Sequence, residues 1–228
     1  MRGLLYFVLT LVTVPNVWSQ TPAPASIETA FYSVSYIEVT PSSRAMAVAA
    51  IKQYRDASRK DDGYVAFEFF EQDGRSGHFA ILETWASQKA YDTHRSAAHS
   101  QQFMSKLEPI RLSDYDQRPY KTLTVVSLTP AANPRAIYVI THVDVGGQGD
   151  AAGLLRRLAE ASRKEEGNLR FDVLLHTMRS NHFTVIEAWQ NQKALDAHAA
   201  AAHTRQYRDG LHPLLGSPLD ERLHKVVE

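Results

Sequence analysis

The sequence predicts an α+β protein made of two tandem β-α-β-β-α-β repeats. The first reason is an internal duplication: the stretch from His78 to His99 returns from His182 to His203, with its glutamate, tryptophan and histidine positions all offset by 104 residues. The second reason is that both copies alternate strand-like and helix-like hydrophobic patterns in the same order. A constant offset over several polar and aromatic identities indicates duplication, so the fold is read per repeat.

Length, charge and cysteine content limit the possible functions. A chain of 228 residues accommodates two domains of about 100 residues each, in agreement with the repeat. Lysine plus arginine and aspartate plus glutamate balance at 25 each, so no net field attracts nucleic acid or an anionic membrane. Because the chain has no cysteine, disulfides, thiolate metal sites and a cysteine nucleophile are excluded.

Residues 1–19 have the pattern of a secretory signal peptide. Arg2 supplies a positive start, and the apolar run from Leu4 to Val14 is too short to span a bilayer comfortably. We expect cleavage near Ser19, a flexible N-terminus over residues 20–30, and a periplasmic or secreted protein without stable membrane contact after processing. An uncleaved N-terminal anchor is the alternative.

The first repeat spans residues 31–128, and each of its elements has a sequence signal. Strands are indicated by alternating aromatic and β-branched residues, helices by apolar residues at helical spacing behind a capping residue, and their ends by glycine and proline. Asp73 to Gly77 is typical of a hairpin turn. The expected order is strand 31–39, helix 41–60, strand 64–72, strand 78–85, helix 87–98 with a second segment 100–107, and strand 120–128.

The second repeat, residues 136–228, matches the first one element by element. It follows a linker at residues 129–135 that contains two prolines, and its first strand is expected at 137–145. Ala161 to Gly167 repeats the helix end seen from Ala57 to Gly63. The β-α-β-β-α-β order describes a ferredoxin-like unit, an antiparallel sheet with helices on one face.

Both faces of each predicted sheet carry apolar side chains. On the strand 78–85, Ile81 and Trp85 share one side, whereas Ala80 and Leu82 share the other. Since the helices of such a unit cover only one face of the sheet, the second face needs another partner. The other repeat is the natural cover, so we expect the two halves to form one pseudo-symmetric barrel within a single chain.

A strand-borne Glu-x-Trp, then Gln-Lys-Ala, then a helix histidine, then a second histidine and an aromatic, occurs in both repeats. This pattern resembles the antibiotic biosynthesis monooxygenase (ABM) domain, a group that includes quinol monooxygenases and belongs to the dimeric α+β barrel superfamily. The resemblance covers nearly all of the chain beyond the signal peptide. It implies a two-sheet barrel formed here as an internal pseudo-dimer, with a further homodimer also possible.

The resemblance implies an activity as well: oxidation of a quinol or polyphenol by dioxygen, in which the substrate anion reduces oxygen directly and no cofactor takes part. The protein would supply a base and a dry cavity for a small aromatic substrate. His94 and His198 are the candidate bases, because a near-neutral histidine takes a proton from a phenol and a carboxylate fixes its tautomer. Glu83 and Glu187 are the nearest such carboxylates in the pattern.

Aromatic residues are the candidate wall of the substrate pocket. The repeats differ around the histidines, where Arg95 corresponds to Ala199, so unequal sites are expected. Each candidate also has a structural interpretation, in which glutamates tie helix to sheet, tryptophans fill the core and histidines form buried hydrogen bonds. The predicted substrate-binding residues are Trp85, Trp189, Tyr32, Tyr36, Tyr138 and His142.

Metal and haem fit the pattern poorly. His94 and His99 are five residues apart, off the three- or four-residue spacing that places two ligands on one helix face. In haem-degrading relatives, the iron-binding histidine lies at the positions of Met104 and Arg208 here, and their helix tryptophan is replaced by His94 and His198. We therefore expect neither a metal site nor a cofactor.

Two other functions stay open at this level. One is a non-catalytic small-molecule-binding or stress-response barrel, and the other is an isomerase or decomposition enzyme that moves protons in the same pocket without oxygen. Oxygen uptake with a panel of hydroquinones separates the monooxygenase from both.

Overall fold

The computed structural model describes residues 25–129 and 133–227. The predicted signal peptide at 1–19 lies outside the described residues, as do residues 20–24 of the expected N-terminal segment and 130–132 of the expected linker. Within the described ranges, no helix has the length and apolar character needed to cross a membrane.

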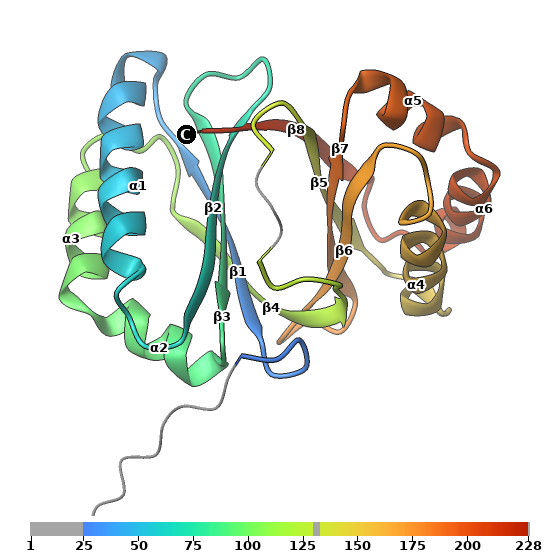
Figure 1. The fold of residues 1–228 in the computed structure, drawn as a ribbon, viewed down its shortest axis with the longest axis horizontal. Coiled ribbons are helices and arrows are strands. Elements are labelled where there is room, and N and C mark those ends of the chain that lie inside the picture. Colours follow the sequence, from blue (N-terminus) through green and yellow to red (C-terminus); the bar gives the residue numbers. More distant parts are fainter. Residues whose placement is uncertain (1–24, 130–132, 228) are drawn as a thin grey trace, which may run out of the picture.

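The first repeat has the predicted β-α-β-β-α-β order (Figure 1). The largest deviation is its last strand, which begins at Asp116 rather than near residue 120 because residues 116–121 pair with the first strand. The elements are β1 (Phe31–Glu38), a 3₁₀ turn (Pro41–Ser43), α1 (Arg44–Ser58), β2 (Tyr64–Gln72), β3 (His78–Trp85), α2 (Gln88–Ser96), α3 (Ala98–Leu107) and β4 (Asp116–Thr124).

The second repeat has the same order, so the duplication read from the sequence is a duplication of structure. A 3₁₀ turn at His212–Leu214 follows its last helix. The elements are β5 (Ile137–Asp144), α4 (Ala151–Ser162), β6 (Asn168–His176), β7 (His182–Trp189), α5 (Gln192–Ala200), α6 (Ala202–Leu211) and β8 (Asp220–Val226).

The eight strands form one closed barrel in the order β1-β3-β2-β8-β5-β7-β6-β4. The last strand of each repeat joins the two halves: β4 pairs with β1 of its own repeat and β6 of the other, and β8 pairs with β5 and β2. Because no sheet edge is left open, the barrel removes the unpaired strands that each repeat alone would expose. The predicted internal pseudo-dimer is confirmed.

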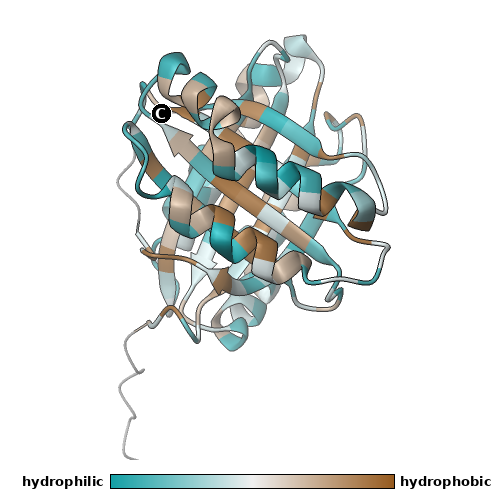
Figure 2. Ribbon diagram, turned by 90° about the vertical axis from the view of Figure 1, so that its right-hand side faces the viewer, coloured by the Kyte–Doolittle hydropathy of each residue, from teal (hydrophilic) through white to brown (hydrophobic). Residues whose placement is uncertain are grey.

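Each sheet therefore has a barrel face and a helix face. In Figure 1, α1 to α3 cover one side of the barrel and α4 to α6 the opposite side. Figure 2, turned toward the second repeat, shows helices with polar outer faces crossing strands rich in apolar residues. One apolar cluster inside the barrel draws side chains from both halves, whereas separate clusters fill the helix side of each repeat. The predicted alternation on strand 78–85 is confirmed, with Ile81 in a helix-side cluster and Leu82 inside the barrel.

A break between α2 and α3 shapes the helix side of the first repeat. Ala97 is extended, with φ −67° and ψ 151°, so the chain turns between Ser96 and Ala98. Gly63, at φ 80°, lets the end of α1 approach α2, because a Cβ at this residue would lie 2.6 Å from the Ala90 Cβ. Gly167 repeats this arrangement in the second half, at φ 81°. The acidic residues before these glycines are thereby held against the helix histidines.

Candidate active site

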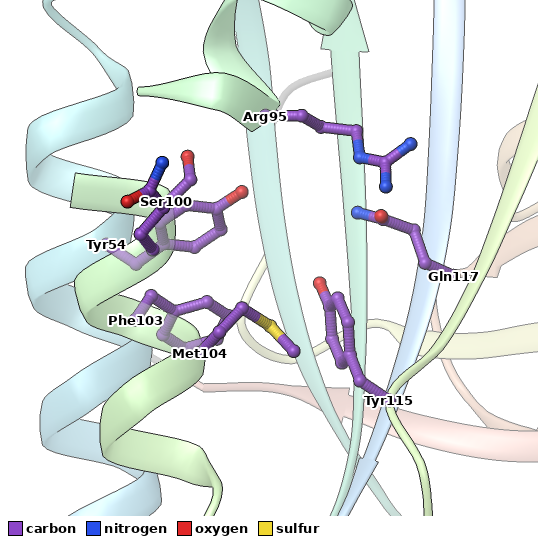
Figure 3. Close-up of a pocket in the computed structure, with 8 residues that line it drawn as sticks. Tyr54, Arg95, Ser100, Phe103, Met104, Tyr115 and Gln117 are labelled. Carbon is purple, nitrogen blue, oxygen red and sulfur yellow. The ribbon is translucent and has the colours of Figure 1, made fainter. Parts of the chain in front are cut away.

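The first repeat contains a cavity of about 320 Å³ between α1, α3 and the segment that leads into β4 (Figure 3). A second cavity of about 470 Å³ adjoins it and shares Arg95, Met104, Tyr115 and Gln117 with it. The inner cavity thus opens outward between α2 and β4. Its lining residues are Tyr54, Arg95, Ser100, Gln101, Phe103, Met104, Tyr115 and Gln117.

Tyr54 links this cavity to a buried polar network. Its hydroxyl lies 2.5 Å from Nε2 of His94 and 3.2 Å from Oε1 of Glu83. The ring stacks on Phe103 with centroids 4.2 Å apart, which fixes the hydroxyl in place. Burial, followed by the charge of Glu83, raises the pKa of Tyr54 well above its ordinary value. The tyrosine is therefore a neutral O–H group that can pass a proton.

His94 is held on three sides behind Tyr54. Trp85 stacks on the imidazole with ring centroids 4.3 Å apart. Nδ1 lies 2.6 Å from Oδ2 of Asp61, and His99 approaches the same oxygen at 3.0 Å. This network assigns the proton on Nδ1 to a bond with Asp61, which leaves Nε2 to accept from Tyr54. Burial opposes protonation of His94, but Glu83 and Asp61 together outweigh it and hold the pKa of His94 above its ordinary value.

Three buried polar atoms around this site have no hydrogen-bond partner among the described residues. They are Oε2 of Glu83, Nε1 of Trp85 and the hydroxyl of Tyr115. An unsatisfied buried polar group costs roughly 1–3 kcal/mol. Tyr115 lines the cavity with its side chain, and its hydroxyl oxygen is buried. Glu83 and Trp85 are fully buried and do not line the cavity, so Tyr115 is the one of the three residues that borders it.

The second repeat keeps the histidine, glutamate and tryptophan but loses the tyrosine. Leu158 stands in the place of Tyr54, at the shared offset of 104. His198 stacks on Trp189 at 4.6 Å and donates from Nδ1 to Glu165 at 2.9 Å, as its counterpart does in the first half. No tyrosine hydroxyl bonds Nε2 of His198 among the described residues, and Glu187 lies 3.7 Å from it.

The second repeat also lacks the space. The corresponding cavity is about 20 Å³, against about 320 Å³ in the first half. Arg208 and Glu221 line it and form an ion pair at 3.7 Å. Glu187 accepts from Nε1 of Trp189 at 2.8 Å, and burial raises the pKa of Glu187 to about 7. Two sites of equal sequence motif have therefore diverged, and the first repeat holds the better-formed one.

A cluster of potential metal ligands accompanies the histidine in each half. Asp61, His94 and His99 form one set, and the matching set is Glu165, His198 and His203. The spacing of five residues argued against two ligands on one helix face, but the helix breaks at Ala97, and Nε2 of His99 therefore lies 3.3 Å from Nδ1 of His94. These residues could hold a metal ion, although the distances between carboxylate and histidine are also those of ordinary hydrogen bonds.

The remaining predicted pocket residues lie inside the barrel, on the other face of the sheet. Tyr32, Tyr36 and Tyr138 belong to the apolar cluster shared by both halves. Nε2 of His142 lies 2.6 Å from the Tyr36 hydroxyl and Nδ1 lies 2.8 Å from Thr184, and burial lowers the pKa of His142 to about 2. The structure therefore does not bring these four residues together with His94, and it places them where the sheets pack on each other.

Sequence reasoning identified His94, Glu83 and Trp85 as a set but missed Tyr54 and Asp61. Asp61 had a signal: its counterpart is Glu165, so the repeated helix end keeps an acid at that position. Tyr54 had no such signal, because the matched residue of the second repeat is Leu158 and the tyrosine is therefore not repeated.

The model of the antibiotic biosynthesis monooxygenase family matches residues 30–106 and again residues 136–210. The chain belongs to this family. Each match contains the Glu-x-Trp strand, the helix histidine and the acidic residue two positions before the glycine, whereas Tyr115 and Gln117 of the cavity lie beyond the first match. The tandem arrangement makes one polypeptide supply both halves of the ABM barrel.

This ABM chain is similar to one curated protein in sequence and to several solved structures in fold. "Putative monooxygenase YcnE" of Bacillus subtilis is 31% identical over 72 residues, which cover 32% of this chain and 76% of YcnE. A "putative monooxygenase" structure from Fusobacterium nucleatum aligns with TM-score 0.74 and 15% identity, covering 89% of this chain and 94% of that one. An "anthrone oxidase-like protein" aligns with TM-score 0.70 and 12% identity, covering 88% and 92%. These two structures share the two-repeat fold.

Proposed function

We propose that this protein is a cofactor-independent monooxygenase that oxidises a quinol or polyphenol with dioxygen in the cavity of its first repeat. The observation that carries the proposal is the chain of contacts from the cavity inward: Tyr54 lines the cavity, its hydroxyl reaches His94, and His94 reaches Asp61. Such a chain accepts a proton from a bound phenol and places it on a buried imidazole. The ABM family match supports the reaction class.

The proton path follows from the assigned hydrogen bonds. A substrate hydroxyl donates to the Tyr54 oxygen while the Tyr54 proton moves to Nε2 of His94, 2.5 Å away. Asp61 accepts from Nδ1 and stabilises the imidazolium that forms, as an orienting carboxylate does in other histidine bases. The raised pKa of Tyr54 disfavours a lasting tyrosinate, so the tyrosine acts as a relay and His94 is the proton store.

The oxidation balances without another reductant. Deprotonation makes the ring electron-rich enough to pass electrons to dioxygen. A hydroquinone then gains one oxygen atom and loses two hydrogens, giving a hydroxyquinone, while the second oxygen leaves as water. All four electrons come from the substrate. Phe103 and Met104 form an apolar wall on one side of the space where the substrate ring would lie.

In this proposal, the second repeat supports the fold and does not carry out the reaction. It closes the barrel through β8 and β6, but its Leu158 and its cavity of about 20 Å³ provide neither a relay nor room for a ring. One active site per chain is therefore expected, in contrast to the two that the duplicated motif alone would allow.

The direct test is oxygen uptake by chelator-treated protein with a panel of hydroquinones, followed by mass spectrometry of the product under ¹⁸O₂. The proposal predicts enzyme-dependent uptake and one labelled oxygen atom in the hydroxyquinone. Uptake that stops after chelation, or a product without label, would contradict it.

A further inference from the structure

The mouth of the first-repeat cavity carries a positive charge that the proposed proton relay does not use. We propose that this cavity selects an aromatic substrate bearing a carboxylate, and that Arg95 binds the carboxylate while Tyr54 receives the phenolic proton. The inference rests on the proposed function for the reaction, and it adds the substrate class.

Arg95 is placed at the junction of the two cavities. It lies on α2 directly after His94, lines both the inner and the outer cavity, and stands over the Tyr91 ring at 5.8 Å from the centroid. The nearby Arg111 is paired with Glu108 and with Asp114. Arg95 has no such ion pair among residues 25–129 and 133–227. Its guanidinium is therefore the unneutralised charge at the mouth.

Two further polar groups face the same space. In Figure 3 the side chains of Arg95, Gln117 and Tyr115 point toward a common volume, with the Tyr54 hydroxyl on its inner side. The Tyr115 hydroxyl is buried and has no partner among the described residues. A guanidinium fork beside a phenolic O–H and an amide matches a carboxylate, which accepts several hydrogen bonds at once.

The rest of the cavity fits an aromatic ring between these two ends. Phe103 and Met104 form an apolar wall, and the inner volume of about 320 Å³ lies at the lower end of the range for small-molecule pockets. A ring that donates its phenol to Tyr54 at the inner end presents its opposite edge toward Arg95. The geometry thus favours a hydroxyaryl carboxylate with the two groups on opposite edges.

The second repeat shows that folding does not need these polar residues. At matched positions Ala199 replaces Arg95, Leu219 replaces Tyr115 and Glu221 replaces Gln117. Helix α5 and strand β8 still form, and the space is closed. The differences between the halves therefore include all three residues that would bind the carboxylate, and the second repeat folds without them.

The test is anaerobic equilibrium binding of two probes, 6-hydroxy-2-naphthoate and 2-naphthol, which differ by the carboxylate. The natural protein should bind the carboxylate probe at least about tenfold more tightly, since a charge-assisted hydrogen bond is worth roughly 1.5–3 kcal/mol. Arg95→Ala, which copies the residue of the second repeat, should lose this preference and keep its affinity for 2-naphthol. Arg75→Ala, at an exposed turn, is the matched control and should keep the preference.

Equal affinity for the two probes, binding of neither, or a preference that survives in Arg95→Ala would overturn the carboxylate site. Parallel oxygen uptake separates this failure from failure of the proposed function. Turnover of neutral hydroquinones without any carboxylate preference would refute the role of Arg95 but not the proposed monooxygenase activity. Carboxylate-selective binding without oxygen uptake would support the role of Arg95 and refute the monooxygenase activity.

Discussion

At the scale of single residues, Tyr54 makes the two repeats different. Both halves keep a histidine between a tryptophan and a carboxylate. The ring centroids of histidine and tryptophan are 4.3 Å apart in the first half and 4.6 Å apart in the second. Nδ1 of the histidine lies 2.6 Å and 2.9 Å, respectively, from the carboxylate oxygen. Only the first half, among the residues described, adds a tyrosine hydroxyl that reaches a cavity. The histidine of the first repeat, His94, is therefore buried behind the group that would meet the substrate.

Asp61→Asn tests the base through its pH dependence. The Asp61 and Glu83 carboxylates hold the pKa of His94 above its ordinary value, and the base must be neutral to work. Removing one negative charge lowers this pKa, so the acidic limb of kcat/KM should move to lower pH while kcat falls through loss of orientation. A pH–rate profile checks both. An unmoved limb would show that His94 is not the titrating base.

Glu187→Gln tests the buried carboxyl of the second repeat through stability. Burial raises the folded pKa of Glu187 to about 7 from an ordinary 4.5, so its contribution to stability is present below pH 4.5 and is lost as pH rises through 7. The glutamine keeps an acceptor for Trp189 and cannot ionise. The variant should therefore gain roughly 2–3 kcal/mol relative to the natural protein at pH 8, and little at pH 4.5. Urea unfolding at both pH values measures this gain, and equal differences at the two would contradict the assignment.

Among the site residues, those that occur in both repeats could be predicted from the sequence. His94, Glu83 and Trp85 recur in both halves, and the structure brings these three together. Tyr54 occurs in the first repeat only, and it contacts Glu83, which lies 29 residues later in the chain on a strand. Tyr32, Tyr36, Tyr138 and His142 were proposed for their aromatic character, but strand alternation turns them toward the barrel.

At the scale of elements, the kink between α2 and α3 assembles the site. A continuous helix would place His99 away from His94, whereas the extended Ala97 lets both reach Asp61. Helix and strand order could be predicted because periodicity and turn residues are local signals. The start of β4 could not, because its first residues are held by pairing with β1, which lies about 80 residues earlier in the chain.

A double substitution, Met104→Arg with Gln117→Glu, tests whether the gap between α3 and β4 is the substrate site. It copies the Arg208–Glu221 pair that lines the closed cavity of the second repeat. We expect turnover to fall at least about 100-fold, because a displaced substrate loses its alignment with the relay. Circular dichroism should show an unchanged fold.

The matched control for this variant is Met46→Arg with Gln102→Glu, at exposed positions on the helices of the first repeat. Full activity in the closed variant would place the reaction elsewhere in the molecule.

At the scale of the whole molecule, a buried ion pair joins the two halves across the barrel. Arg170 on β6 contacts Glu68 on β2 at 2.8 Å and Asp172 at 2.6 Å, and its side chain is 5% exposed. The need for a cover on the bare sheet face predicted that the halves would pack together. It did not predict this pair, because charged residues in a strand are read as solvent-facing.

Arg170→Met should destabilise both halves together. It leaves Glu68 and Asp172 without their cation, and breaking a buried pair from one side costs about 3–5 kcal/mol. Lys225→Met is the control, since Lys225 pairs with Asp73 across the same two halves but at the exposed surface, where a pair is worth about 0–1 kcal/mol. Urea denaturation should show one cooperative transition. Two separate transitions would indicate that the halves are independent domains.

In the proposed function, one relay in the first repeat drives oxidation by dioxygen. The measurement that tests it most directly is oxygen uptake with the best hydroquinone of a panel, compared between Tyr54→Phe and Tyr207→Phe. Both substitutions remove one buried hydroxyl on the helix side, but Tyr207 belongs to the closed site of the second repeat.

We predict that Tyr54→Phe loses about 10²–10⁴ in kcat, as expected for loss of a proton-transfer group, while Tyr207→Phe keeps the rate of the natural protein. Folding of both variants is checked by thermal unfolding. A well-folded Tyr54→Phe protein with full oxygen uptake, or an equal loss in Tyr207→Phe, would contradict the account.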